Sequence, residues 1–557
     1  MEVLSIEHIS YFFKTSMTPI PYFFWQAISN LFGHENIAAY RAMNILFHAF
    51  NGLLVYRLAL AVGQIFLGKD KLSYFSFFST FLFLFHPVQV ESVVWLSSFR
   101  GIIATTFMLL AIESLSQALF SKESQSLSPE KTVIFLCLLS LGLLSKPTAV
   151  SMILLVPLIP LFEFAVSADK KKMQQKLSSL APILISFSVL AVGIVLLHKG
   201  EVLTIQTTNL TIIQKLTLTT ASLSSYILNL VLPFQLVFDY QINPFVLDYL
   251  REEKLDFVLR LLSPLGLMLS LSCLVIPGKK IYGAFALAFL CVLSPHIGLI
   301  FHDFQNISTV ADRYLYSSLI PFAWLTSSII VAIGEKLPFV KAHRRTNTLI
   351  GFLCAGVLLL NFRQVSLWRT PRVLLERSTT KDSLQAPILI ALANHHLEQQ
   401  HYKKAKELLR EGLLREAYSQ DALLNLIWIN ELIPLETDTY FIAQEIRKRT
   451  KEPYSNLMVP FARVLIRAKD YALAKKYLQL AQSKGIDARV VQPLLQKVNN
   501  FQDSEVTDAL MRLADYYYVL GKFSLALSYV EESIKRFGSS QSLVEKQKLI
   551  KAQILKK

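Results

Sequence analysis

Residues 42–66 read AMNILFHAFNGLLVYRLALAVGQIF, an apolar run in which Arg57 is the single charged residue. A helix needs about 20 apolar residues to cross the hydrocarbon core of a bilayer, so this run predicts a membrane-spanning helix. Apolar runs recur as far as about Leu360, and the candidate spans are 42–66, 102–119, 148–164, 180–197, 257–276, 281–301, 316–333 and 348–360, with shorter runs at 72–85 and 132–145. We therefore predict about ten spans and treat residues 221–238 as interfacial or re-entrant.

The composition of the whole chain is typical of a membrane protein. Of its 557 residues, 53% are hydrophobic and 17% are charged, and the mean hydropathy is +0.43. Soluble proteins carry about 25% charged residues, so these values exclude a simple soluble globule as well as disordered and collagen-like chains. The cysteines lie inside apolar runs and predict neither a disulfide framework nor a zinc cluster; they are Cys137, Cys273, Cys291 and Cys354.

The net charge of +16 reflects membrane topology. Fourteen loop cations between Lys69 and Arg345 alternate with a smaller set of seven that includes Arg100, Lys146 and Arg313. Because Lys and Arg collect in cytoplasmic loops, the larger set predicts the cytoplasmic side. The C-terminal tail is then periplasmic or lumenal, although one miscounted span would place it in the cytoplasm. No basic-aromatic platform appears, so we predict no nucleic-acid partner.

The tail after about Lys381 has the composition of a soluble helical protein and contains a recurrent spacing. A small residue is followed nine positions later by an aromatic residue, then by a small and an aliphatic residue, in three stretches: Ala393, Tyr402, Ala405, Leu409; Ala462, Tyr471, Ala474, Leu478; and Ala514, Phe523, Ala526, Val530. This spacing resembles the tetratricopeptide repeat, whose concave face binds peptides or proteins. An unspecialised amphipathic helical tail is the alternative interpretation.

Ionisable residues gather where apolar runs end on the predicted outer side. The run 72–85 is too short to span and leads to His86 and Glu91, and the run 132–145 leads to Lys146. A third outer segment ends in Asp312-Arg313-Tyr314. Irregular backbone at membrane depth is tolerated where it lines a cavity, so we expect Glu91 and Lys146 to lie inside an outward-facing cavity.

Such a cavity would suit transfer from an anionic lipid. Arg313 and Lys146 could stabilise the charge of a leaving phosphate, and a carboxylate could accept the proton of an attacking hydroxyl. Each residue also has a purely structural interpretation: Glu91 as a packing acid, Asp312-Arg313 as an ion pair, Lys146 as an interfacial lysine, and His86 as a helix-end residue.

The motifs HPVQVESV (86–93), LLSKP (143–147) and ADRYLY (311–316) follow one another in the order of a known family, and Asn44, His48 and Asn51 add an N-x-x-x-H-x-x-N pattern. Over about residues 10 to 370 the chain resembles the transmembrane-and-tetratricopeptide-repeat O-mannosyltransferases and their bacterial homologues, which are C-type membrane glycosyltransferases. The resemblance implies transfer of a sugar, typically mannose, from a polyprenyl-phosphate sugar to a protein hydroxyl. It also implies that the repeats help to present the acceptor protein or peptide.

Carried over by position, Glu91, Lys146, Asp312, Arg313 and Tyr314 match motif positions of the family. We predict Glu91 as the catalytic residue and roles in binding the lipid phosphate or the sugar for His86, Arg100, Lys146, Asp312, Arg313 and Tyr314. The lipid-linked sugar is a co-substrate, and we predict no cofactor and no metal. The expected fold is all-α: an outer loop region lacking a first span (1–41), a multi-pass glycosyltransferase-like domain (42–366), a linker (367–382) and a repeat domain (383–557). The expected location is the bacterial inner membrane, or alternatively the endoplasmic reticulum.

Two departures from the family keep an alternative open. Family members begin with a further span and a loop that supplies the catalytic aspartate, whereas no aspartate precedes Asp70 here, and an expected acid after the His-Pro motif is Gly101. Either the true start lies upstream, or the catalytic base is lost or supplied by Glu91. If the catalytic base is lost, the chain would be an inactive, membrane-anchored repeat scaffold. A transporter is disfavoured because hydropathy shows no inverted repeat.

Overall fold

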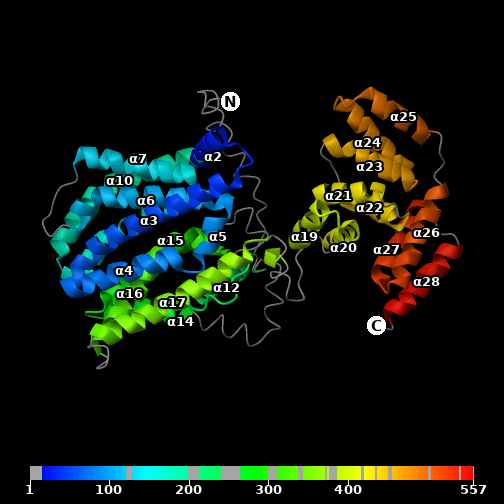
Figure 1. Ribbon diagram of the computed structural model, residues 1–557. Coiled ribbons are helices and arrows are strands. Elements are labelled where there is room, and N and C mark those ends of the chain that lie inside the picture. Colours follow the sequence, from blue (N-terminus) through cyan, green and yellow to red (C-terminus); the bar gives the residue numbers. More distant parts are fainter. Residues whose placement is uncertain are drawn as a thin grey trace. The chain divides into compact units, whose positions relative to one another are not determined.

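The structure is a computed structural model, which describes residues 16–120, 128–167, 169–197, 212–238, 240, 264–276, 278–298, 310–336, 343–370, 373–375, 386–414, 420–432, 436–449, 455–499, 504–537 and 541–555. Every regular element in these ranges is a helix. The chain divides into two compact units, Met1–Ser378 and Thr379–Lys557, and the boundary lies inside the predicted linker (Figure 1).

The described helices of the first unit form a bundle (Figure 1). Its α-helices are α2 (Pro19–Phe32), α3 (Ile37–Phe66), α4 (Lys69–Phe85), α5 (Gln89–Val94), α6 (Phe99–Phe120), α7 (Pro129–Ser145), α8 (Met152–Leu155), α9 (Leu158–Ser167), α10 (Lys170–Leu197), α12 (Ile212–Val231), α14 (Pro264–Ser272), α15 (Lys280–Leu293), α16 (Leu319–Lys336) and α17 (His343–Leu367). Short 3-10 helices include η2 (Pro147–Ser151), η5 (Ser294–His296) and η7 (Asp312–Leu315). The predicted N-terminal loop region therefore contains a helix, α2.

Four helical stretches of the described residues are long and apolar enough to cross a membrane: Ile37–Phe66, Leu96–Leu115, Met173–Ile194 and Ile350–Leu367. Five shorter apolar helices accompany them: Lys71–Phe85, Pro147–Phe162, Leu218–Val231, Lys280–His296 and Leu319–Ile333. The first part of the predicted span 257–276 and the end of the span 281–301 lie outside the described residues. The predicted total of about ten crossings stays a prediction.

Prolines decide where several of these helices end. Pro87 follows His86 and Pro147 follows Lys146, and a residue before proline is driven out of the helical conformation. His86 is accordingly extended (φ −63°, ψ 133°) just after α4, and Lys146 is extended (φ −156°, ψ 126°) just after α7. The predicted span 148–164 is not one helix, because Pro157 separates α8 from α9.

The long helix α3 is central to the bundle and packs against both α4 and α6, while α6 also packs against α7. Glycines allow α4 to approach α3 closely. A Cβ atom on Gly52 would lie 2.6 Å from a methyl carbon of Leu84, and one on Gly63 would lie 2.6 Å from Leu72. Small residues at such contacts let helix backbones pack in van der Waals contact within a membrane.

The second unit is a series of helical hairpins. Its helices are α19 (Ala386–Glu398), α20 (Tyr402–Leu414), α21 (Gln420–Leu432), α22 (Glu436–Arg449), α23 (Ser455–Arg467), α24 (Tyr471–Ser483), α25 (Ala488–Asn499), α26 (Ser504–Val519), α27 (Phe523–Phe537) and α28 (Gln541–Leu555). The aromatic residue of each sequence repeat begins the second helix of a hairpin. The small residues lie between the paired helices with no exposed surface; they are Ala393, Ala405, Ala462, Ala474, Ala514 and Ala526. The pair α21 and α22 lies in the interval between the first two stretches of the repeated spacing.

The three hairpins share one turn geometry. Gln400, Lys469 and Gly521 occupy the same turn position and have φ of 59°, 62° and 70°. The next residue in each turn donates its backbone N–H to a carbonyl five residues earlier, a bond that closes helix ends of this kind: His401 to His396 (2.8 Å), Asp470 to Leu465 (2.8 Å) and Lys522 to Tyr517 (3.0 Å). The turn that favours glycine is therefore present in all three hairpins, although the sequence supplies glycine in one.

Candidate functional site

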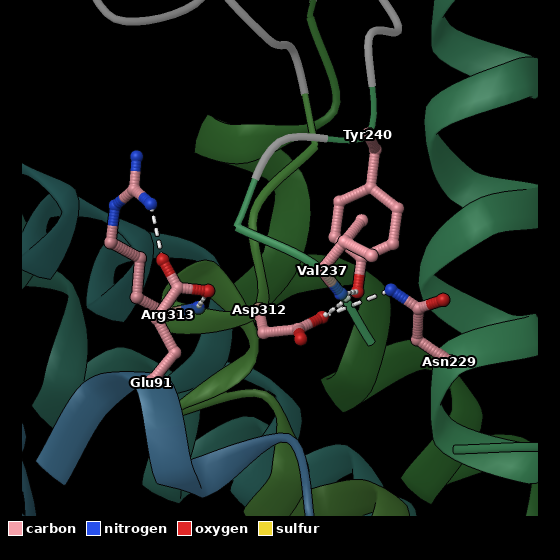
Figure 2. A network of polar contacts seen from close by, with 6 residues as sticks. All are labelled: Glu91, Asn229, Val237, Tyr240, Asp312 and Arg313. Atoms are coloured by element: carbon pink, nitrogen blue, oxygen red, sulfur yellow. Dashed lines mark hydrogen bonds and ion pairs between the residues drawn. The ribbon is translucent and has the colours of Figure 1, made fainter. Parts of the chain in front are cut away.

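An ion pair joins two of the sequence motifs in the first unit. Glu91 lies on the short helix α5, and Arg313 lies on η7. The guanidinium of Arg313 donates to the Glu91 carboxylate, and the backbone N–H of Arg313 donates to its second oxygen at 3.3 Å (Figure 2). Both side chains are largely buried, with exposed fractions of 2% for Glu91 and 10% for Arg313. A charged pair this deep is costly to desolvate and must be well bonded to persist.

The neighbouring carboxylate points away from this pair and into a different set of bonds. Asp312 accepts from the side-chain amide of Asn229 on α12 at 3.0 Å and from the hydroxyl of Tyr240 at 2.8 Å. Figure 2 shows the two acids on opposite sides of the η7 backbone. Asp312 is therefore the residue that fixes η7 to α12, while Arg313 faces α5.

A small polar cavity lies beside this segment. Its charged and aromatic lining comes from Lys146, His296, Arg313, Tyr314 and Tyr316. The Lys146 ammonium lies 5.3 Å from the centre of the Tyr314 ring, and the Arg313 guanidinium lies 4.9 Å from the same ring. Glu91 offsets the charge of Arg313, and burial lowers the pKa of Lys146 to about 7. An anion that enters the cavity would hold Lys146 in its charged form, which makes the cavity suited to an anion.

A larger apolar hollow adjoins the polar cavity. It is lined by aliphatic and aromatic side chains of α3, α6, α8, α9, α15 and α16, including Ile112, Phe162, Phe285 and Trp324. Met108, Val292 and Ser317 line both spaces. A ligand with an anionic end and a long apolar end would match this pair of spaces, since each part would meet groups of its own polarity.

Buried polar residues of α3 hold this region together. The imidazole of His48 is 2.9 Å from the Tyr316 hydroxyl and 3.1 Å from the Leu84 carbonyl, and the Asn51 amide donates to both Tyr316 (3.0 Å) and the Ile102 carbonyl (3.1 Å). The Leu84 carbonyl is an acceptor, so the facing His48 nitrogen carries the proton and the other nitrogen accepts from Tyr316. The N-x-x-x-H-x-x-N pattern thus connects α3 with the segment that carries Arg313.

Three predicted substrate-binding residues lie outside the cavity lining: Asp312, whose bonds are given above, Arg100 and His86. Arg100 donates to the hydroxyl of Tyr22 at 2.7 Å, and its guanidinium lies 5.3 Å and 5.6 Å from the ring centres of Tyr22 and Trp25 on α2. His86 is buried and its ring nitrogen is 3.0 Å from the carbonyl of Leu230. These contacts give structural roles to all three side chains, and their substrate-binding roles stay predictions.

Lys146, Arg313 and Tyr314 are the predicted site residues that line the cavity, and Glu91 reaches it through Arg313. Sequence reasoning missed His296 and Tyr316. His296 follows Pro295 inside the predicted span 281–301, so a search for polar residues at the ends of apolar runs missed it. A histidine beside a proline, as in His86-Pro87, is the signal that could have found it. In the described part of the chain, no group of three or more His, Cys, Asp or Glu side chains is placed to hold a metal ion.

A comparison with models of known protein families gave no match, and neither did searches of curated proteins and of solved structures.

Proposed function

We propose that this chain is a membrane glycosyltransferase that moves a sugar, typically mannose, from a polyprenyl-phosphate sugar to a protein hydroxyl. The observation that carries the proposal is the contact between the cationic cavity and the apolar hollow, which share Met108, Val292 and Ser317. The donor has the same two parts, a charged phosphate and a long apolar chain. The ordered motifs that resemble the C-type O-mannosyltransferases support the same assignment.

The residues divide the chemistry between them. In the transfer, the bond between the anomeric carbon and the phosphate oxygen breaks, and the phosphate leaves with the electron pair. Arg313 and Lys146 would stabilise that developing charge, which is an effect of preorganised positive groups in a dry site. Glu91 would hold the Arg313 guanidinium in position, and the apolar hollow would hold the first isoprene units of the lipid.

The repeat unit completes the proposal. Its helical hairpins have the buried small residues and repeated turns of tetratricopeptide-like repeats, and such solenoids bind extended peptides on a concave face. We propose that it presents the acceptor protein on the outer or lumenal face of a bacterial inner membrane, or of the endoplasmic reticulum in a eukaryotic host.

A second candidate function is an inactive membrane-anchored scaffold that displays the repeats to protein partners. It is favoured by one observation: the carboxylates of Glu91 and Asp312 are both bonded to other protein groups and are absent from the described lining of the cavity. A protein of this kind would bind a partner through its repeats without binding or consuming a lipid-linked sugar.

The two functions are separated by an assay on the full-length protein in lipid nanodiscs. Polyprenyl-phosphate mannose, polyprenyl-phosphate glucose and a Ser/Thr-rich peptide are supplied, and glycopeptide and released sugar are measured. The enzyme proposal expects turnover of at least one donor, and expects Lys146→Met, which leaves the Glu91–Arg313 pair intact, to slow it by about 10- to 100-fold. Absence of turnover and of donor binding with both donors would favour the scaffold.

A further inference from the structure

His296 lines the polar cavity, whose described lining contains no carboxylate. It ends the short helix η5 directly after α15, and it is 4% exposed. Its ring stacks on that of Tyr314 with the centres 4.3 Å apart and the planes 9° from parallel. It lines the cavity together with Lys146 and Arg313.

The other titratable groups of the described lining are poor proton acceptors for this reaction. Arg313 is always protonated. Burial lowers the pKa of Lys146 to about 7, and a bound phosphate would shift it back toward the charged form. The phenols of Tyr314 and Tyr316 are protonated at neutral pH, since tyrosine ordinarily titrates near pH ~10. Of these residue types, histidine has the ordinary pKa closest to neutrality, which is the property that a general base needs.

The described carboxylates closest to the cavity are already engaged. Glu91 accepts two bonds from Arg313, and Asp312 accepts from Asn229 and Tyr240. To act as a base, Glu91 would first have to release Arg313 inside a buried site. Neighbouring residues hold His296 in place. The ring of Tyr314 covers one face of the imidazole, and the hydroxyl of Tyr226 donates to the backbone carbonyl of His296 at 3.3 Å.

We propose that His296 is the general base of the sugar transfer, an inference that rests on the function proposed above. The hydroxyl oxygen of the acceptor forms a bond to the anomeric carbon, and its proton passes to the imidazole of His296. The bond from the anomeric carbon to the phosphate oxygen breaks, and the lipid phosphate departs as an anion beside Arg313 and Lys146. The proton then leaves His296 to solvent or to the phosphate, which restores the neutral ring.

The experiment compares wild type with His296→Gln, His296→Ala and the control His34→Gln, whose side chain is largely exposed on a different segment. Full-length proteins in nanodiscs receive radiolabelled polyprenyl-phosphate mannose or glucose, whichever the wild type consumes. Transfer to a Ser/Thr-rich peptide and hydrolysis to free sugar are followed across pH, and binding of polyprenyl phosphate is measured separately. Added imidazole tests rescue of His296→Ala, because small bases can replace a missing general base but not a missing packing group.

We expect kcat of His296→Gln to fall about 100-fold or more, which is the usual contribution of a general base. Lipid-phosphate binding should change less than about threefold, the acidic limb of the wild-type pH profile should disappear in the variant, and imidazole should restore turnover to His296→Ala. The groups that face His296 and could distort that limb are Lys146, Arg313, Tyr314 and Tyr226.

Three results would overturn the proposal. If His296→Gln turns over at the wild-type rate, His296 is not the base. If turnover and lipid-phosphate binding are lost together and imidazole gives no rescue, the role of His296 is structural. If wild type itself consumes neither donor, the proposed glycosyltransferase function fails and this inference fails with it, an outcome that is recognised before any variant is made.

Discussion

Glu91 and Arg313 are 222 positions apart in the sequence, yet the carboxylate of one accepts both the guanidinium and the backbone N–H of the other. The pair joins α5 to η7 inside the first unit. The Arg313 guanidinium also lies 4.5 Å from the centre of the ring of Trp95, the residue that follows the C-terminal end of α5. The position of the main cavity cation is therefore set by a residue from a distant motif.

Replacement of Glu91 by Gln should destabilise the protein. The change leaves the Arg313 charge buried without its partner, and breaking a buried ion pair in this way costs about 3–5 kcal/mol. The matched control is Glu531→Gln, which breaks the half-exposed pair with Lys551 (3.1 Å) and should cost about 1 kcal/mol or less. The midpoint of thermal unfolding of the full-length protein is measured for both variants in one detergent. Equal decreases in the two midpoints would show that the Glu91 pair contributes no more stability than an exposed ion pair.

Replacement of Lys146 by Met should weaken the binding of a lipid phosphate and slow sugar transfer by about 10- to 100-fold, because one charge-assisted bond to the phosphate is lost. Lys146→Arg keeps the charge and should recover part of the activity. Lys69→Met, at the exposed start of α4, is the control for loss of one cation. Turnover at saturating and limiting donor concentrations gives the measurement. Equal activity of Lys146→Met and Lys69→Met would remove Lys146 from the site.

Ala288→Phe should fill part of the apolar hollow and raise the KM for a long-chain donor by about tenfold. A donor whose lipid is a single isoprene unit should be affected less, because it does not reach so far. Leu287→Phe is the control, since the neighbouring Leu287 does not line the hollow. If both variants change KM equally for long and short donors, the hollow is not where the lipid binds.

Gln400→Gly should stabilise the first hairpin of the repeat unit by about 0.5–1 kcal/mol. Gln400 has φ of 59°, a conformation that costs an L-residue about 1–2 kcal/mol and costs glycine almost nothing, although glycine loses more backbone entropy on folding. Gly521→Ala should destabilise the third hairpin for the same reason. Hydrogen exchange of α19, α20, α26 and α27 in the full-length protein measures the opening free energies.

Gln399→Gly is the control for this turn, since the described non-glycine residues with positive φ are Gln400 and Lys469. Glycine at position 399 can relieve no strain, so protection of α19 and α20 should fall or stay unchanged. Greater protection in Gln399→Gly than in Gln400→Gly would contradict the left-handed turn.

The helices of the membrane unit could largely be predicted from apolar run length. The runs 42–66, 72–85 and 132–145 each lie inside one helix, because an apolar segment satisfies its backbone most simply as a helix. Hydropathy could not predict the turn that divides α8 from α9 within the run 148–164, because it counts Pro157 as an ordinary residue and ignores its missing N–H.

The site could be predicted only in part. Motif order and polar residues at run ends indicated Lys146 and Arg313, and these do line one cavity. The bonding of the carboxylates could not be predicted: Asp312 pairs with Asn229 and Tyr240, which come from segments with no motif, and Arg100 is held by aromatic residues of α2. Such pairings depend on which helices become neighbours. In the repeat unit, the spacing predicted the hairpins. The turns at Gln400 and Lys469 could not be predicted from glycine, because these two positions have positive φ without a glycine.

The central claim is that the cavity and the hollow together bind a lipid phosphate, and direct binding tests it. Binding of fluorescent polyprenyl phosphate to the full-length protein in nanodiscs is measured for wild type, Lys146→Met and Ala288→Phe, with unlabelled polyprenyl phosphate or uncharged polyprenol as competitor. The account predicts that the fluorescent lipid binds saturably and that polyprenyl phosphate displaces it at least tenfold better than polyprenol does. It also predicts that each of the two substitutions lowers the affinity for the fluorescent lipid. Equal competition by the two lipids, with affinity unchanged in both variants, would contradict it.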